Sequence, residues 1–451
     1  MKKKIRRGLS ATQILVVGFI LVIVAGASLL HLPVSSRNGE TTPFLDCLFT
    51  SVSATCVTGL VVVDTATHWS TFGHIIILLM IQTGGLGFMT IAALLSMLLR
   101  RNVSPRERIL LANSYNLSSF EGLVPLVRRV LCGTMFFEVC GAILLSSRFI
   151  PLFGLGRGLW MGLFHSVSAF CNAGFDLLGG YTGAFSSLTG FVEDPTVSLT
   201  IAALIMIGGI GFIVWDDIYE WLSRRNPLTV YTKLVLSISC TLWVGGTLIY
   251  AVQEWNNPAT LGVLGTPDKV TAAFFQAVTM RTAGFNTISL NDMTSVSQIV
   301  SLLLMFIGGA SGSTAGGVKV VSFALVFYAV WVLASGRRHI TLFRRTVSVD
   351  TLMRAFTLCG IQFIITMAAA LVLLSADCEL MPALFEVFSA SGTVGLTLGL
   401  TPTLQVIPRI VVMILMYFGR VGILTIAMAG HTKSIDEQNQ MRYADAHLMI
   451  G

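Results

Sequence analysis

The segment LFTSVSATCVTGL at 48–60 has three related copies further along the chain: LFHSVSAFCNAGF at 163–175, AFFQAVTMRTAGF at 273–285 and LFEVFSASGTVGL at 384–396. In all four segments a phenylalanine stands ten residues before a glycine, and leucine or phenylalanine follows that glycine. The glycines are Gly59, Gly174, Gly284 and Gly395, at intervals of 115, 110 and 111 residues. A shared frame at such even intervals predicts a chain made of four repeated units.

Long apolar runs flank each of these segments. The 451 residues are 54% hydrophobic and 11% charged, with a mean hydropathy of +0.80, whereas soluble domains carry about 25% charged residues. This composition excludes a soluble globular domain, a disordered chain, a collagen and a secreted disulfide scaffold, and it predicts a polytopic helical membrane protein. The runs lie in pairs near 12–32 and 72–98, 127–149 and 196–215, 232–252 and 297–335, and 354–375 and 406–430.

Each copy of the repeated segment is too short to cross a membrane, so it predicts a re-entrant pore helix between two spans. Two crossings return the chain to the same side, and the four units are therefore expected to be parallel. The predicted fold is all-α, with four span–pore loop–span repeats around a central ion pore. The expected units are 1–110, 111–228, 229–345 and 346–451, the last including a C-terminal tail.

Basic residues cluster between these units, for example at Arg100 and Arg101 and at Arg224 and Arg225, and account for the net charge of +7. Basic loops remain on the cytoplasmic side of a membrane. The charge therefore predicts a multi-pass protein surrounded by membrane lipid, with both termini cytoplasmic. Binding to nucleic acid is not expected.

The turn after each pore helix predicts a cation site made of backbone. A helix entering from outside directs its partly negative C-terminal end at the membrane centre, glycine permits a sharp return, and rings of carbonyls replace a cation's hydration shell. The side chain before each glycine is uncharged, so carbonyls should bind K⁺, or Na⁺, without an organic cofactor. The candidate filter residues are Val57, Thr58, Gly59, Asn172, Ala173, Gly174, Thr282, Ala283, Gly284, Thr393, Val394 and Gly395.

A glycine-rich mark recurs in the second span of every unit: QTGGLGF at 82–88, MIGGIGF at 206–212, FIGGASG at 306–312 and YFGRVGI at 417–423. In the first two units, close helix packing is the favoured interpretation. In the third unit Gly308–Gly317 are all Gly, Ala, Ser or Thr; they form either a packing face or, as we favour, an unwound loop beneath the filter. The candidate gate residues are Gly308, Gly309, Ser311, Gly312, Ser313, Thr314, Gly316, Gly317, Lys319 and Arg420.

Ionisable residues within spans are candidates for function. Arg420 stands where the other units carry a second glycine; we interpret it as a pore-facing charge below the filter, with a structural arginine paired to a carboxylate as the alternative. Glu138 is either the buried partner of a basic residue or part of a vestibule. Arg281 is expected to anchor the back of the filter, and Lys319 either anchors the loop or faces the cytoplasmic vestibule.

The motifs TCVTGL, CNAGF, RTAGFNT and GTVGLT, with GGLGF, GGASGSTAGGVK and FGRVG, resemble the Trk/Ktr/HKT superfamily of potassium and sodium translocating proteins, most closely its bacterial KtrB branch. The resemblance extends from about Thr12 to Gly451. It implies a potassium-translocating subunit of the bacterial inner membrane, a homodimer, and a cytoplasmic KtrA-like nucleotide-binding ring that gates it. Met280 departs from the family pattern, in which proline is common at this position.

Three classes of function compete. A channel-like cation subunit is favoured over a secondary transporter with alternating access, for which two-part repeats with matched broken helices are expected. A glycine in all four filter segments suggests potassium, but each segment contains only one. A sodium-preferring or sodium-coupled transporter on the same fold therefore stays open as an alternative. An intramembrane enzyme is not expected, since the chain has no HExxH motif and no GxSxG motif with suitable partner residues.

Overall fold

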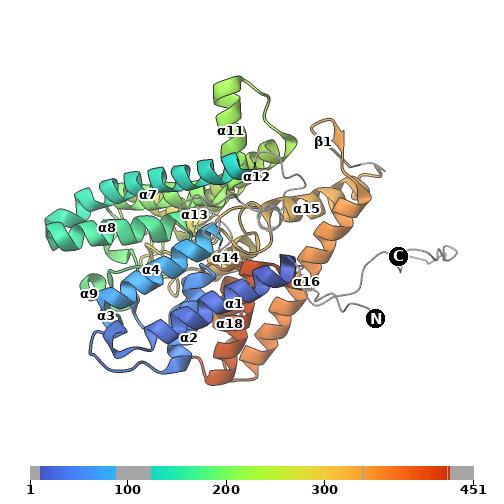
Figure 1. Ribbon diagram of the computed structural model, residues 1–451. Coiled ribbons are helices and arrows are strands. Elements are labelled where there is room, and N and C mark those ends of the chain that lie inside the picture. Colours follow the sequence, from blue (N-terminus) through green and yellow to red (C-terminus); the bar gives the residue numbers. More distant parts are fainter. Residues whose placement is uncertain (1–10, 88–122, 338–339, 424, 427–451) are drawn as a thin grey trace, which may run out of the picture.

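The computed structural model describes residues 11–87, 123–337, 340–423 and 425–426. Within these ranges the chain is a bundle of helices with one antiparallel hairpin, β1 (Thr341–Leu342) and β2 (Arg345–Thr346). The prediction of an all-α polytopic membrane protein is confirmed. Figure 1 shows α13 and α14 in the middle of the view, with α7, α16 and α18 toward its edges. The unit boundaries remain predictions, and the first of them, at 110, lies outside the described residues.

Four helices of the described chain are continuous and apolar over a length sufficient to cross a membrane. They correspond to the predicted first span of each unit. They are α1 (Ala11–Leu30), α7 (Leu123–Phe153), α12 (Val230–Glu254) and α16 (Val349–Leu374).

A shorter helix of 12 to 16 residues follows each of these spans and ends at a filter segment. These pore helices are α2 (Phe44–Thr55), α8 (Leu155–Phe170), α13 (Thr266–Thr279) and α17 (Leu380–Gly392). The repeated phenylalanine is fully buried in three of them, as Phe49, Phe164 and Phe385. In the third unit Phe274 is only half-buried and its neighbour Phe275 is buried instead. The repeated phenylalanine thus fixes three of the pore helices in the core, and its neighbour takes this place in the third.

The second crossings of the second, third and fourth units are broken, whereas continuous runs were expected outside the third unit; in the first unit the described part of the second crossing ends at Gly87. A left-handed glycine ends two of these helices: Gly87 (φ 81°) ends α4 (Thr71–Leu86), and Gly422 (φ 90°) ends α18 (Val406–Val421). In the second unit Gly211 (φ 97°) separates α10 (Pro195–Gly209) from α11 (Phe212–Arg224), and these two helices are bent by 93°. The third crossing consists of α14 (Ser295–Phe306), a loop and α15 (Val320–Ala334).

Polar caps start three of these second crossings at the face where the pore helices begin, which the sequence predicts to be the outer face. The side chains of Ser70, Asp194 and Thr294 accept hydrogen bonds from the first-turn amides of α4, α10 and α14. Such caps satisfy amides that have no partner within the helix. The outer loops add short helical turns: η1 (Pro33–Ser35), α3 (Thr65–His68), α9 (Gly179–Thr182), η2 (Thr189–Phe191) and η3 (Thr401–Thr403).

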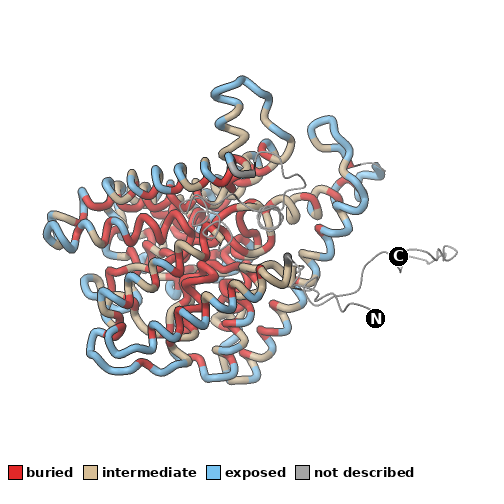
Figure 2. Tube along the Cα trace, viewed as in Figure 1, coloured by how far each residue is buried: buried red, intermediate tan, exposed pale blue. Residues whose placement is uncertain are grey.

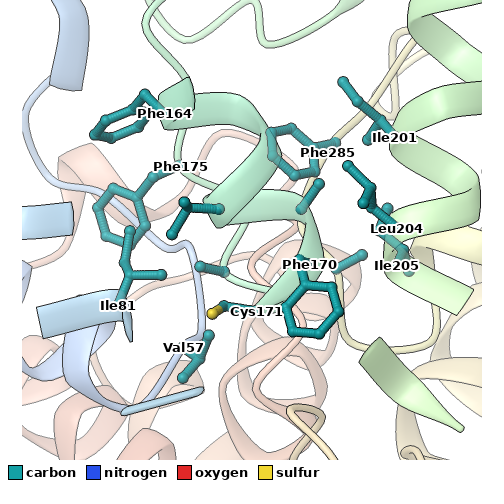
Figure 3. Packing of buried hydrophobic residues seen from close by; sticks show 14 of the residues in the cluster. Val57, Ile81, Phe164, Phe170, Cys171, Phe175, Ile201, Leu204, Ile205 and Phe285 are labelled. Atoms are coloured by element: carbon teal, nitrogen blue, oxygen red, sulfur yellow. The ribbon is translucent and has the colours of Figure 1, made fainter. Parts of the chain in front are cut away.

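The core lies between the pore helices, and the outward helix faces are apolar and exposed (Figure 2). Figure 3 shows residues of three units packed around the end of α8: Cys171 lies beside Val57 and Phe175 beside Ile81 of the first unit, while Phe170 lies on the side of Ile205, with Phe285 of the third unit in the same cluster. The outer surface exposes large apolar side chains such as Leu21, Ile143, Phe327 and Leu371. Exposed apolar area of this extent suits contact with lipid.

Candidate functional site

The four predicted filter segments share one backbone conformation. Their first residues, Val57, Asn172, Thr282 and Thr393, have φ between 52° and 67°, and their glycines have φ between 70° and 96°. The residue between each pair is outside the left-handed region. Glycine adopts such angles without the strain that a Cβ imposes, which explains its place at the end of every segment.

The glycines form a closed ring. A Cβ added to any one of them would collide with the carbonyl oxygen that precedes the glycine of the next unit. The pairs are Gly59 with Ala173 O (2.5 Å from the added Cβ), Gly174 with Ala283 O (2.8 Å), Gly284 with Val394 O (2.8 Å), and Gly395 with Thr58 O. The last pair returns to the first unit, so all twelve predicted filter residues surround one axis.

The middle amide of each filter segment is hydrogen-bonded within the protein, whereas the filter carbonyls of the described residues are not. The amide of the middle residue in each segment donates to a carbonyl of its own pore helix: Thr58 to Ser53 (2.8 Å), Ala173 to Ser168 (2.7 Å), Ala283 to Thr279 (3.1 Å) and Val394 to Ser389 (2.7 Å). Among the described residues, no donor binds a carbonyl oxygen of the twelve filter residues. Unpaired buried carbonyls are costly, so this ring suits a cation that they can coordinate.

Hydroxyl groups near the pore-helix ends hold the filter from behind, and the sequence reasoning missed them. In the first and fourth units Ser53 and Ser389 accept hydrogen bonds from the filter glycine amides, at 3.1 and 3.0 Å. In the other two units Ser168 and Thr279 donate to the carbonyls after the glycine, of Phe175 and Phe285, at 2.7 and 2.5 Å. A serine six residues before the glycine in three units was the available signal.

A cavity of about 400 Å³ opens on the outer side of the ring. All four filter glycines line it, together with Asp64, Asp176 and Asn286. Burial raises the pKa of Asp176 to about 6, although the amide of Leu178 donates to its carboxylate at 2.9 Å. Both aspartates place acidic side chains at the space that leads to the filter. The cavity can therefore concentrate cations at the filter entrance.

The glycine marks in the second crossings provide close packing, as the sequence predicted for the first two units. A Cβ on Gly84, Gly208 or Gly419 would overlap a carbonyl oxygen at the end of a pore helix, that of Thr55, Phe170 or Ser391 respectively. The second helices therefore rest directly on the pore-helix ends. The same glycine-rich segments also end α4, α10 and α18, a role that the packing interpretation did not include.

Replacing Gly208 by alanine is expected to lower the melting temperature in detergent by several degrees, because the new methyl group must displace the Phe170 carbonyl. Overpacking of this kind costs about 1–3 kcal/mol. The matched control is Gly360→Ala in α16, where a Cβ meets no atom within 4 Å. That variant should melt at or slightly above the wild-type temperature, since alanine favours helix by about 1 kcal/mol. Equal melting of both variants would contradict the packing role.

The predicted gate segment is a buried loop that is closed at its base. The amide of Gly308 donates to Val318 O at 2.8 Å, and the amide of Val320 donates to Gly309 O at 3.0 Å. The segment Ser311–Gly316 lies beyond this closure. Lys319 anchors the loop from its lower end, because its Nζ donates to Ala315 O at 2.8 Å. The interpretation of the ten small residues as an unwound loop fits this geometry.

The loop fills the breaks of the neighbouring second crossings. The amide of Ala310 donates to Gly209 O at 3.0 Å and that of Phe212 to Gly312 O at 2.8 Å, which join the loop to the second unit. The amide of Gly317 donates to Gly419 O at 3.1 Å, which joins it to the fourth. The loop therefore holds together helix ends from separate units.

Arg420 joins this loop to the first unit. Its guanidinium donates to the carbonyl of Thr314 in the loop, to Gly84 O (3.1 Å from Nε) and to Gly85 O (2.9 Å). The last two carbonyls belong to the C-terminal end of α4, which carries partial negative charge. None of the four ion pairs in the described ranges includes Arg420, so the carboxylate-paired alternative finds no support there.

Arg281 and Glu138 are buried behind the filter. One guanidinium nitrogen of Arg281 donates to Gly308 O at 3.2 Å, and its guanidinium carbon lies 5.3 Å from the ring centre of Trp243. Arg281 thus connects the third filter segment to the base of the loop, as an anchor would. Glu138 accepts a hydrogen bond from the side-chain amide of Gln82 at 3.2 Å. Its partner is therefore an amide and not the basic side chain that one of the two interpretations expected.

The profile of the TrkH family, described as a cation transport protein, matches residues 2–440. The chain belongs to the TrkH family. The predicted resemblance to the Trk/Ktr superfamily is thereby confirmed. The ring of carbonyls, the re-entrant helices and the loop described above are thus features of a TrkH-family cation transport protein.

Two curated relatives cover nearly the whole chain. The potassium/sodium uptake protein NtpJ of Enterococcus hirae is 39% identical over 100% of this chain and 99% of that protein. The Ktr system potassium uptake protein B of Bacillus subtilis is 38% identical over 97% of this chain and 96% of that protein. The potassium transporter TrkH from Vibrio parahaemolyticus has the same fold, with a TM-score of 0.73 at 16% identity, covering 96% of this chain and 87% of that chain.

Proposed function

We propose that this TrkH-family chain is the membrane-embedded, potassium-translocating subunit of a Ktr/Trk-type uptake system. The observation that carries the proposal is the closed ring in which each filter glycine faces the carbonyl of the next unit. Carbonyls without protein donors are suited to replace the hydration shell of an ion. The names of two full-length relatives, both potassium uptake proteins, support potassium as the cargo.

The proposed gate is the Gly308–Gly317 loop together with Lys319 and Arg420. Its support is that this loop of the third unit is hydrogen-bonded to the second and fourth units, and through Arg420 to the first. A KtrA-like cytoplasmic nucleotide-binding ring would move this loop, and the word "system" in the name of the Bacillus relative supports such a partner. The homodimer and the bacterial inner membrane follow from the resemblance, and the cytoplasmic termini follow from the positions of the basic residues; residues 1–10 and 427–451 lie outside the described residues.

The alternative is a sodium-preferring or sodium-coupled transporter of the same fold. One observation favours it: the Enterococcus relative is named a potassium/sodium uptake protein. The broken second crossings also resemble the discontinuous helices of transporters. However, the breaks in the described residues lie at the glycine marks of the second, third and fourth units rather than in two matched halves. The four filter segments share one backbone conformation, which supports channel-like conduction.

Cation flux into liposomes that contain the purified protein tests the proposal. We expect potassium flux to exceed sodium flux by about tenfold or more, a difference of about 1.4 kcal/mol, and to proceed without a sodium gradient. Empty liposomes provide the background. Potassium uptake that stops when sodium is removed would establish the coupled alternative, and flux equal to the background would refute both.

A further inference from the structure

The fourth pore helix contains a fully buried carboxylate that the conduction path described above does not use. Glu386 lies in α17 with none of its surface exposed, nine residues before Gly395. The corresponding positions in the other units are occupied by Thr50, His165 and Phe275. The fourth unit is therefore alone in placing an acid at this depth of the pore helix.

Two hydroxyl groups bind this carboxylate. Thr397 donates to one oxygen at 2.7 Å and Thr401 donates to the other at 2.6 Å. Thr397 is two residues after Gly395, and it lines the same outer cavity as the four filter glycines. Glu386 therefore lies one side chain away from the space that an ion must cross.

The described residues give Glu386 no positive partner. Their four ion pairs do not include it. Glu254, the other acid with no exposed surface, differs because four hydrogen bonds from Asn257, Thr260 and Thr294 surround it. Buried charges are normally paired or bound to a metal ion. Two neutral hydroxyls are its protein partners, so an ionised Glu386 needs a countercharge from outside the protein.

The hydroxyl of Thr397 has only one hydrogen-bonding position left. Its proton is committed to Glu386, and one lone pair accepts the amide of Leu400 at 3.1 Å. A hydroxyl has one donor and two acceptor positions, so one lone pair is left. The group can present oxygen, and no proton, to the cavity. Such a group attracts a cation.

We propose that Glu386 is a positioning residue that sets the affinity of the outer cavity for the transported cation. The cation in the cavity supplies the countercharge of the carboxylate, and the Thr397 oxygen, oriented by Glu386, faces it. This inference rests on the proposed function, since it assigns the entry site of the same pore. It concerns affinity, and the filter ring remains responsible for selectivity.

The test compares Glu386→Gln with Glu386→Asp in potassium uptake by liposomes. Glutamine keeps the size of the side chain and removes its charge, so we expect KM for potassium to rise about tenfold while the maximal rate stays within about twofold. Aspartate keeps the charge but is one methylene shorter, so it weakens both hydroxyl contacts. If charge sets the affinity, KM of the aspartate variant should stay within about threefold of wild type. A purely structural role would make aspartate at least as harmful as glutamine.

A second measurement does not depend on flux. Potassium should raise the melting temperature of the detergent-solubilised protein, and Glu386→Gln should require about tenfold more potassium for the same rise. An unchanged KM in the glutamine variant, or equal rises in KM in both variants, would overturn the inference. If Glu386→Gln yields no folded protein, Glu386→Asp decides alone: a KM more than threefold above wild type overturns it. Failure of the proposed function would differ, because the wild type itself would then show no potassium flux.

Discussion

Replacing Gly59 by serine is expected to lower the preference for potassium over sodium by about tenfold or more, equivalent to about 1.4 kcal/mol of lost discrimination. A Cβ at this glycine would lie 2.5 Å from the carbonyl oxygen of Ala173 in the next unit. The left-handed backbone of Gly59, with φ of 96°, also disfavours serine. The substitution therefore displaces carbonyls of two units at once. The measurement is the ratio of potassium to sodium flux in liposomes.

The matched control is Gly39→Ser. Gly39 also has a positive φ, of 71°, but a Cβ there meets no atom within 4 Å. Backbone strain is thus present in both variants, whereas collision with a filter carbonyl occurs in one. We expect the control to keep the wild-type flux ratio and Gly284→Ser to behave like Gly59→Ser. Wild-type selectivity in both filter variants would remove the filter assignment.

Repetition made the architecture predictable from the sequence. A single apolar segment of a dozen residues does not specify a pore helix, but four copies with glycines at even intervals do. The frame residues are those that the structure needs most: Phe49, Phe164 and Phe385 fill the core, and each glycine makes room for a neighbour's carbonyl. Because these requirements are steric, they leave a visible pattern in residue type.

The breaks in the second crossings were harder to predict. The sequence GGxG suits both a close helix contact and a helix end, since glycine permits both. Gly208 and Gly211 divide these roles: the first packs against Phe170, and the second turns the chain between α10 and α11. The spacing alone does not distinguish the two. Only the unusual length of the small-residue run at Gly308–Gly317 indicated a break in advance.

Contacts to backbone leave no pattern in the sequence. Arg420 was identified as a departure from the glycine mark, but its partners are carbonyls of Gly84, Gly85 and Thr314. Every residue carries a carbonyl, so residue types do not reveal which ones an arginine reaches. The role of the serines that hold the filter was not predicted, for a related reason. Ser53 accepts a hydrogen bond where Ser168 donates one, and the two arrangements share no further sequence signal.

Deleting Ser311–Gly316 is expected to raise basal potassium flux by about tenfold or more and to weaken its dependence on the cytoplasmic partner. The deleted residues lie beyond the closure that the amide of Gly308 makes with Val318 O, so α14 and α15 can remain joined. Thr314 is lost with them, and with it the bond that holds Arg420 to the loop. Flux into liposomes with and without the partner gives the measurement, and melting in detergent establishes that the variant is folded.

Arg420→Ala separates charge from obstruction, because it leaves the loop in place. Repulsion between two unit charges at 4 Å is worth about 4 kcal/mol at an effective dielectric of about 20, so removing the charge should also raise basal flux, by a smaller factor than the deletion. The guanidinium already donates to three carbonyls, which offset part of its charge. A folded deletion variant that conducts no faster than wild type would show that the loop is no barrier. If Arg420→Ala alone raised flux, the barrier would be the arginine, and the loop would serve to position it.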